Sequence, residues 1–143
     1  MSRIIAVADA LTDAINAHAW REPLTAVRLD TPSVDLEELN YLRAVVIPTT
    51  QTRERVARIA IENTYTIQVG LQQRLRQGEE VERAAQLRSL ADDLADWLMI
   101  HRLGTLDACP IEVADSQPVQ QHLDEWSLYT HVITATYHEV TQL

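Results

Sequence analysis

The clearest hydrophobic pattern in the chain is an alternation that runs from Ile61 to Leu75. The side chains on its apolar side are Tyr65, Ile67, Val69 and Leu71, and those on its other side are Thr66, Gln68, Gly70 and Gln72. Successive side chains of a strand point to opposite faces of the sheet. The pattern therefore predicts a half-buried strand in a sheet that has one covered face.

Helical periodicity appears on both sides of this strand. A first helix is predicted from Arg3, with Ser2 as its cap, to about Trp20. The longest helix is predicted from Glu79 to about Leu103, with Arg102 in its last turn where a cation suits the helix dipole. We expect both helices to lie on the sheet. Trp97 shares the apolar stripe of the long helix and is predicted to be buried against the sheet.

Other segments supply the remaining strands. They are predicted at residues 25–29, 43–47, 110–114 and 128–140, with a helical turn at 35–41. Pro48 removes a ladder donor, so pairing should stop there or continue only at an edge, and a loop should follow. The strand at 110–114 should lie at an edge, and the strand at 128–140 should pair near the alternating strand. The expected fold is α+β, a single domain over residues 1–143: a mainly antiparallel β-sheet with an N-terminal helix and a long central helix packed on one face.

The segment after Pro48 shows no clean period and carries Arg53, Arg55 and Arg58. Two interpretations are open. The commoner explanation for such a run is a solvated loop with incidental charge. The alternative is a projecting arm that meets an acidic surface of a partner.

Overall charge narrows the function classes. The chain has 143 residues, with 21 acidic and 12 basic side chains and a net charge of −9. Every basic residue is Arg, and the acidic excess argues against tight, phosphate-driven binding of nucleic acid.

Cys109 is the only cysteine, so no intramolecular disulfide can form, and a reducing compartment is expected. Neither a signal peptide nor a membrane span is predicted.

No reactive constellation emerges from the motifs. The five histidines are scattered, and no two of them have the spacing of metal ligands. His131 and His138 should face opposite sides of their strand. Asp92, Asp93 and Asp96 suit a solvated helix face better than a pair of catalytic carboxylates. We therefore predict no catalytic, cofactor-binding or metal-binding residue.

Several stretches carry a family resemblance. They are Asp35-Leu36-Glu37-Glu38-Leu39 leading into Val45-Val46-Ile47-Pro48, the strand end Val69-Gly70-Leu71-Gln72-Gln73-Arg74, and Thr134-Ala135-Thr136-Tyr137. With the order of predicted elements, they make the chain resemble the small neck and tail-completion proteins of long-tailed bacteriophages, most closely the tail terminators. The likeness spans nearly the whole chain through diffuse patterns.

The resemblance implies a non-enzymatic structural protein of the virion neck, without cofactor or membrane contact, that is assembled in the host cytoplasm. Such a protein forms a homo-oligomeric ring, commonly a hexamer, which caps the tail tube protein, ends tail polymerisation and offers a surface to the head-completion or connector protein. DNA would pass through the lumen without specific binding. The alternatives are a head-proximal connector or stopper of the same neck, and a small enzyme or metal-dependent regulator.

Candidate interface residues follow from this expectation. They are Arg53, Arg55 and Arg58 on the basic segment and Tyr129 and His131 on the last strand. Glu54, Val56 and Ile59 interrupt the basic segment, so an arm and a short helix both remain open for it. Which sheet face meets a neighbouring subunit is also open.

Overall fold

The computed structural model describes residues 2–30, 41–103, 108–115, 119, 122–123 and 127–142. Most of the predicted helical turn at 35–41 lies outside these residues.

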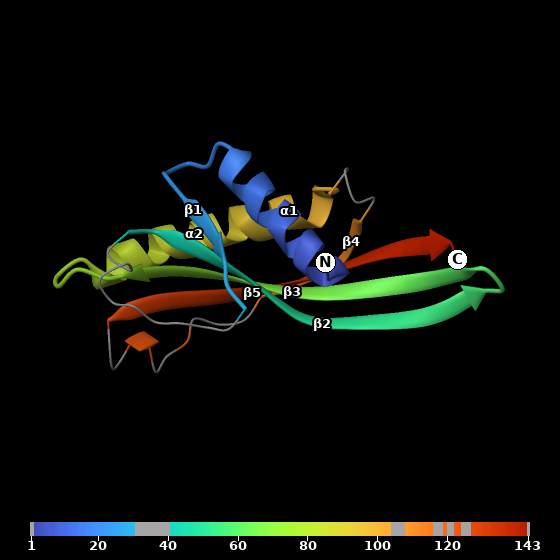
Figure 1. The fold of residues 1–143 in the computed structure, drawn as a ribbon. Helices are drawn as coiled ribbons and strands as arrows, with labels where there is room; N and C mark the ends of the chain where they lie inside the picture. The colour runs from blue at the N-terminus through green and yellow to red at the C-terminus, as the bar shows by residue number, and fades with distance from the viewer. Residues whose placement is uncertain are drawn as a thin grey trace.

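An α+β architecture is observed, as predicted (Figure 1). The helices are α1 (Arg3–Ala17) and α2 (Glu80–Ile100). The strands are β1 (Thr25–Arg28), β2 (Arg43–Ala57), β3 (Ala60–Arg74), β4 (Cys109–Asp115) and β5 (Leu128–Gln142). They form one sheet in the order β1-β2-β3-β5-β4, in which β1 and β2 are parallel and the other neighbours are antiparallel. Both helices lie on the same face of the sheet (Figure 1).

The core lies between this face and the two helices. The pairing of β3 with β5 is continuous over fifteen residues, so the alternation of each strand stays in phase with the other. Buried side chains of the two strands include Tyr65, Ile67, Val69, Leu71, Ile133, Ala135 and Tyr137. They pack in one cluster with α1 residues such as Leu11 and Ile15 and with α2 residues such as Leu90 and Leu94. The prediction drawn from the alternation at Ile61–Leu75 is confirmed.

Strand β2 continues past Pro48 to Ala57. Continuation at an edge was one of the two predicted outcomes and is confirmed, whereas the loop expected after Pro48 is wrong. Strand β1 covers only Arg43 to Val46, and beyond that point β2 is an edge strand of the described sheet. A register shift between Pro48 and Thr50 accommodates the proline, because edge strands and bulges tolerate a residue without an amide proton.

The helix ends also depart from the prediction. Ser2 occupies the N-cap position of α1 without a side-chain capping hydrogen bond, and the helix ends at Ala17 rather than near Trp20. Helix α2 ends at Ile100, so Arg102 lies outside it and its last turn has no basic residue. No helix in the described part of the chain combines the length and the apolar character that a bilayer crossing requires.

Candidate functional site

The hairpin formed by β2 and β3 extends beyond the ends of both helices as an arm, defined here as residues 52–61 (Figure 1). Arg53 pairs with Asn63, Arg55 with Ile61 and Ala57 with Ala60. Arg58 and Ile59 therefore form the turn at the tip. The segment is neither a loop nor a short helix, and it places all three predicted arginines on one projecting hairpin.

The arm is both basic and apolar at its surface. All side chains from Thr52 to Ile59 are exposed, including Val56 at 50% and Ile59 at 57%. Among the residues that the structure describes, no ion-pair partner contacts Arg53, Arg55 or Arg58. The arm therefore presents guanidinium groups interspersed with apolar side chains to whatever approaches it.

The other two candidate residues lie elsewhere. Tyr129 and His131 are only 2% exposed and belong to the helix-covered face of β5, where the Tyr129 hydroxyl and His131 Nδ1 are 3.2 Å apart. A residue of the monomer core cannot contact a neighbouring subunit. The inclusion of Tyr129 and His131 in the interface was wrong, because their strand face is the one that the helices cover.

A polar network fixes the root of the arm to α1. Glu139 on β5 is 6% exposed and accepts hydrogen bonds from Arg3 Nε at 2.6 Å and Arg3 Nη2 at 2.7 Å. The Tyr65 hydroxyl on β3 also donates to Glu139. Hydrogen bonding by Arg3, and then by Tyr65, lowers the pKa of Glu139 below its ordinary value, whereas burial raises the pKa of Tyr65 to about 12. The start of the chain is thus bonded to its last strand, a contact that the sequence analysis missed.

Replacing Glu139 by Gln should lower the free energy of unfolding at pH 7 by about 1 to 2 kcal/mol, because the hydrogen bonds lose their charged acceptor. The folded-state pKa of Glu139 is depressed, so this stabilisation is present above the ordinary pKa of 4.5 and is lost as the pH falls through the folded value. Urea unfolding of both proteins between pH 7 and pH 3 measures the difference. A gap that stays constant over this range would contradict the role of the carboxylate.

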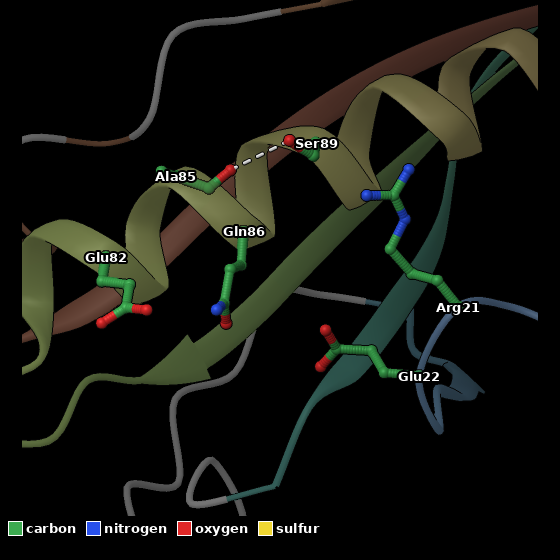
Figure 2. Close-up of a pocket in the computed structure, with 6 residues that line it drawn as sticks. All are labelled: Arg21, Glu22, Glu82, Ala85, Gln86 and Ser89. Atoms are coloured by element: carbon green, nitrogen blue, oxygen red, sulfur yellow. Dashed lines mark hydrogen bonds between the residues drawn. The ribbon is translucent and has the colours of Figure 1, made fainter.

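A shallow depression lies between α2 and the loop that follows α1 (Figure 2). The residues that line it are Arg21, Glu22, Glu82, Ala85, Gln86 and Ser89. Arg21 pairs with Asp93, and the Ser89 hydroxyl donates to the Ala85 carbonyl at 3.2 Å. Glu82, Ala85, Gln86 and Ser89 lie spread along α2, and Arg21 and Glu22 lie on the segment opposite it (Figure 2).

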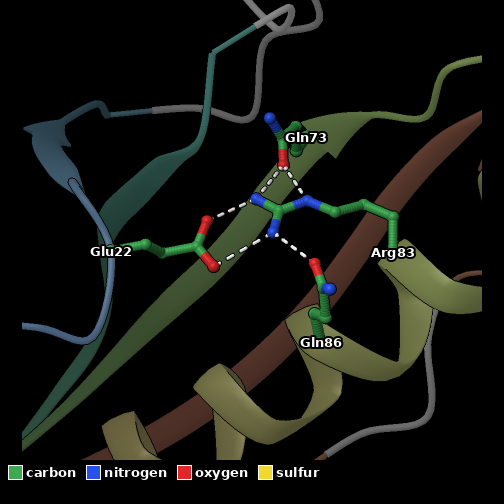
Figure 3. A network of polar contacts seen from close by, with 4 residues as sticks. All are labelled: Glu22, Gln73, Arg83 and Gln86. Carbon is green, nitrogen blue, oxygen red and sulfur yellow. Dashed lines mark hydrogen bonds and ion pairs between the residues drawn. The ribbon is translucent and has the colours of Figure 1, made fainter.

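Beside this depression, Arg83 joins three parts of the fold (Figure 3). Its guanidinium donates to Gln73 on β3, to Glu22 in the loop after α1 and to Gln86 on α2. The bond from Nε to Gln73 is 2.9 Å long, and the bonds from Nη1 to Glu22 and Gln86 are each 3.0 Å. These contacts pair the charges of Arg83 and Glu22 within the chain and connect the first half of α2 to β3.

Trp97 occupies an aromatic cluster at the helix C-termini. It stacks on His101 with ring centroids 4.3 Å apart, and it lies 5.3 Å from Trp20 and 5.4 Å from His18. Burial, followed by the nearby His18, lowers the pKa of His101. Trp97 packs against the core but is only partly buried, so the prediction that it is buried between α2 and the sheet was wrong. The apolar stripe of α2 continues past the sheet onto the end of α1.

Replacing Trp97 by Ala should therefore cost about 1 to 3 kcal/mol of unfolding free energy, less than the usual 3 to 5 kcal/mol for a fully buried Trp. Trp97→Phe should restore most of the loss, because a ring still packs between His101 and Trp20. Denaturant unfolding followed by circular dichroism provides the measurement. A loss above about 4 kcal/mol would show that the indole is more deeply buried than the structure has it.

Titratable residues elsewhere form no common site in the described ranges. Asp92 and Asp96 are exposed on α2, and Asp93 pairs with Arg21, in agreement with a solvated helix face. The continuous register of β5 places His131 and His138 on opposite faces, as predicted. Within the described residues, no group of three His, Cys, Asp or Glu side chains is arranged to hold a metal ion.

Comparisons with known proteins describe the fold alone. No family model and no curated protein matches the chain. Solved structures do match, and one of them, whose name states no function, covers 100% of this chain and 98% of its own, with a TM-score of 0.50 and 21% sequence identity. At this identity the match supports the arrangement of helices and strands and carries no information about activity.

Proposed function

We propose that this protein is a structural component of a bacteriophage neck, a tail terminator that assembles as a ring on the tail tube. The proposal starts from the resemblance described above. Its ring would end tail polymerisation and provide the surface on which the head-completion protein docks.

The observation that carries this proposal is the arm. A hairpin with Arg53, Arg55 and Arg58 projects from a chain of net charge −9, and its exposed side chains find no ion-pair partner among the described residues. A head-to-tail ring needs two different patches on each subunit, and a projecting arm of opposite charge to the rest of the chain is suited to one of them. The arm is also anchored, because Arg3 and Tyr65 hold Glu139 at its root.

Electron microscopy of particles from a host that lacks this protein tests the proposal. Tails longer than normal are expected, because nothing would stop the tube from growing. Tails of normal length that lie apart from full heads would instead indicate a connector or stopper of the same neck. Normal virions would contradict both roles.

Thermal melting distinguishes the proposed ring protein from a metal-dependent regulator. For the ring protein, the melting temperature should be the same with and without a chelator, because a structural ring protein of this kind needs no bound ion to fold. A fall of more than about 5 °C on chelation would favour the regulator. Native mass spectrometry of the same sample checks for a bound cofactor.

A further inference from the structure

An uncovered face runs along the second half of α2. Asp92, Asp96 and Met99 follow one another at helical spacing, and Ile100 lies one turn after Asp96, so the four side chains share one side of the helix. All four are exposed, with Met99 at 46% and Ile100 at 79%. This α2 face combines acidic groups with large apolar side chains that remain in water.

The electrostatics of this end of α2 are unbalanced. A helix C-terminus carries a partial negative charge, which basic side chains in the last turn normally offset. The last turn of α2 has none, and Arg102, just beyond it, donates to Cys109 Sγ at 3.0 Å. Asp92 and Asp96 lie in the turns just before this end and add exposed negative charge to the same side of the helix, which an external cation would complement.

The arm has the inverse character. Its three arginines, Arg53, Arg55 and Arg58, outnumber its one acidic residue, Glu54, and Val56 and Ile59 are exposed beside them, so the arm offers net positive charge together with apolar surface. The arm of the same chain points away from α2, and the hydrogen-bonded ladder along β2 and β3 prevents it from folding back (Figure 1). The two complementary surfaces of one chain thus cannot meet within that chain.

We propose that the arm of one copy docks on the α2 face of a second copy, with Arg53, Arg55 and Arg58 near Asp92 and Asp96 and with Val56 and Ile59 against Met99 and Ile100. The inference rests on the proposed ring and names its two patches. Because the patches differ, a pair joined by one contact keeps one free arm and one free α2 face, so the contact propagates until a ring closes. Burial of the apolar groups removes water from the ion pairs and strengthens them.

Reciprocal charge reversal tests the contact in the full chain. The double variant R53E/R55E and the double variant D92R/D96R should each weaken self-association by about tenfold or more, because like charges then face each other. An equimolar mixture of the two should assemble like the parent, since each reversed arm meets a reversed α2 face and each original arm meets an original face. Sedimentation or light scattering over a concentration series measures the association.

Matched controls separate this contact from general effects of charge. The variant R74E/R76E changes the net charge by the same amount at two exposed arginines outside the arm, and it should assemble like the parent. Circular dichroism melting of every variant checks that folding is intact. Reversed variants that assemble normally, or a mixture that fails to regain assembly, would overturn the proposed pairing.

Cross-linking identifies the partner residue directly. The chain has no Lys, so Arg55→Lys introduces a single side-chain amine that a zero-length carbodiimide can join only to a nearby carboxylate. The peptide linked to the introduced amine should contain Asp92 or Asp96. In a mixture of isotope-labelled and unlabelled chains, part of the linked pairs should join one labelled and one unlabelled peptide, which shows that the link connects two copies. Linkage to other carboxylates, or a parent protein that stays monomeric at every concentration and on purified tails, would refute the contact. Tail length in the absence of the protein reports separately on the neck function, so the two proposals can fail independently.

Discussion

Replacing Leu94 by Ala should lower the free energy of unfolding by about 2 to 5 kcal/mol. Leu94 is 0% exposed and belongs to the core cluster through which α2 packs against β4 and β5. Truncation removes buried methyl groups and leaves a cavity that the rigid sheet fills poorly. Urea unfolding monitored by circular dichroism measures the loss.

The control for this variant is Val81→Ala on the same helix. Val81 is 88% exposed, so its truncation should change stability by less than about 0.5 kcal/mol, with a slight gain from the higher helix propensity of Ala. Equal effects at positions 81 and 94 would mean that α2 does not pack on the sheet through its Leu90 and Leu94 face.

Removing the hydroxyl from Tyr65 and from Tyr137 should have opposite effects on stability. The two residues pair directly across β3 and β5, and both are 0% exposed. The Tyr65 hydroxyl donates to the Glu139 carboxylate, whereas the buried Tyr137 hydroxyl has no hydrogen-bond partner among the residues that the structure describes. Tyr65→Phe should therefore cost about 1.5 to 3 kcal/mol, the range for a hydrogen bond to a charged group.

Tyr137→Phe should instead raise the free energy of unfolding by about 1 kcal/mol, because it removes a buried polar group that folding strips of water. The same desolvation raises the pKa of Tyr137 above that of an ordinary phenol. Parallel denaturant curves for the two variants make each the control for the other. Destabilisation by both would indicate that the Tyr137 hydroxyl is bonded in solution.

The strands that sequence analysis placed best have one buried and one exposed face. In β3 and β5 the buried face selects apolar residues at every second position, and the uninterrupted register keeps that selection visible for fifteen residues. Strand β4 was also found, at the expected edge. These elements could be predicted because burial leaves a period in the sequence.

The arm could not be predicted in this way. Both of its faces lie in water from Thr52 to Ile59, so neither face selects apolar residues and no period arises. Pro48 added a misleading signal, since its missing donor matters little in an edge strand with a shifted register. The arginines were visible in the sequence, but the hairpin that presents them was not.

The burial of Tyr129, His131 and Glu139 could have been predicted from the alternation along β5. Tyr129 and His131 share the phase of Ile133 and Tyr137, which indicates the covered face despite the polarity of His. Glu139 continues the same phase, which places its carboxylate on the covered face. Its partner Arg3 is 136 positions away and could not be identified without the fold.

The strand order has a consequence for biosynthesis. Strand β5 follows β4 in the chain, yet it lies between β3 and β4 in the sheet. In a nascent chain whose β5 has not left the ribosome, the edges of β3 and β4 that pair with β5 are therefore unpaired. Arg3 also has no Glu139 to bind. The sheet can close only after synthesis has passed residue 142, so premature release upstream of β5 should yield chains that aggregate or are degraded rather than chains with partial function.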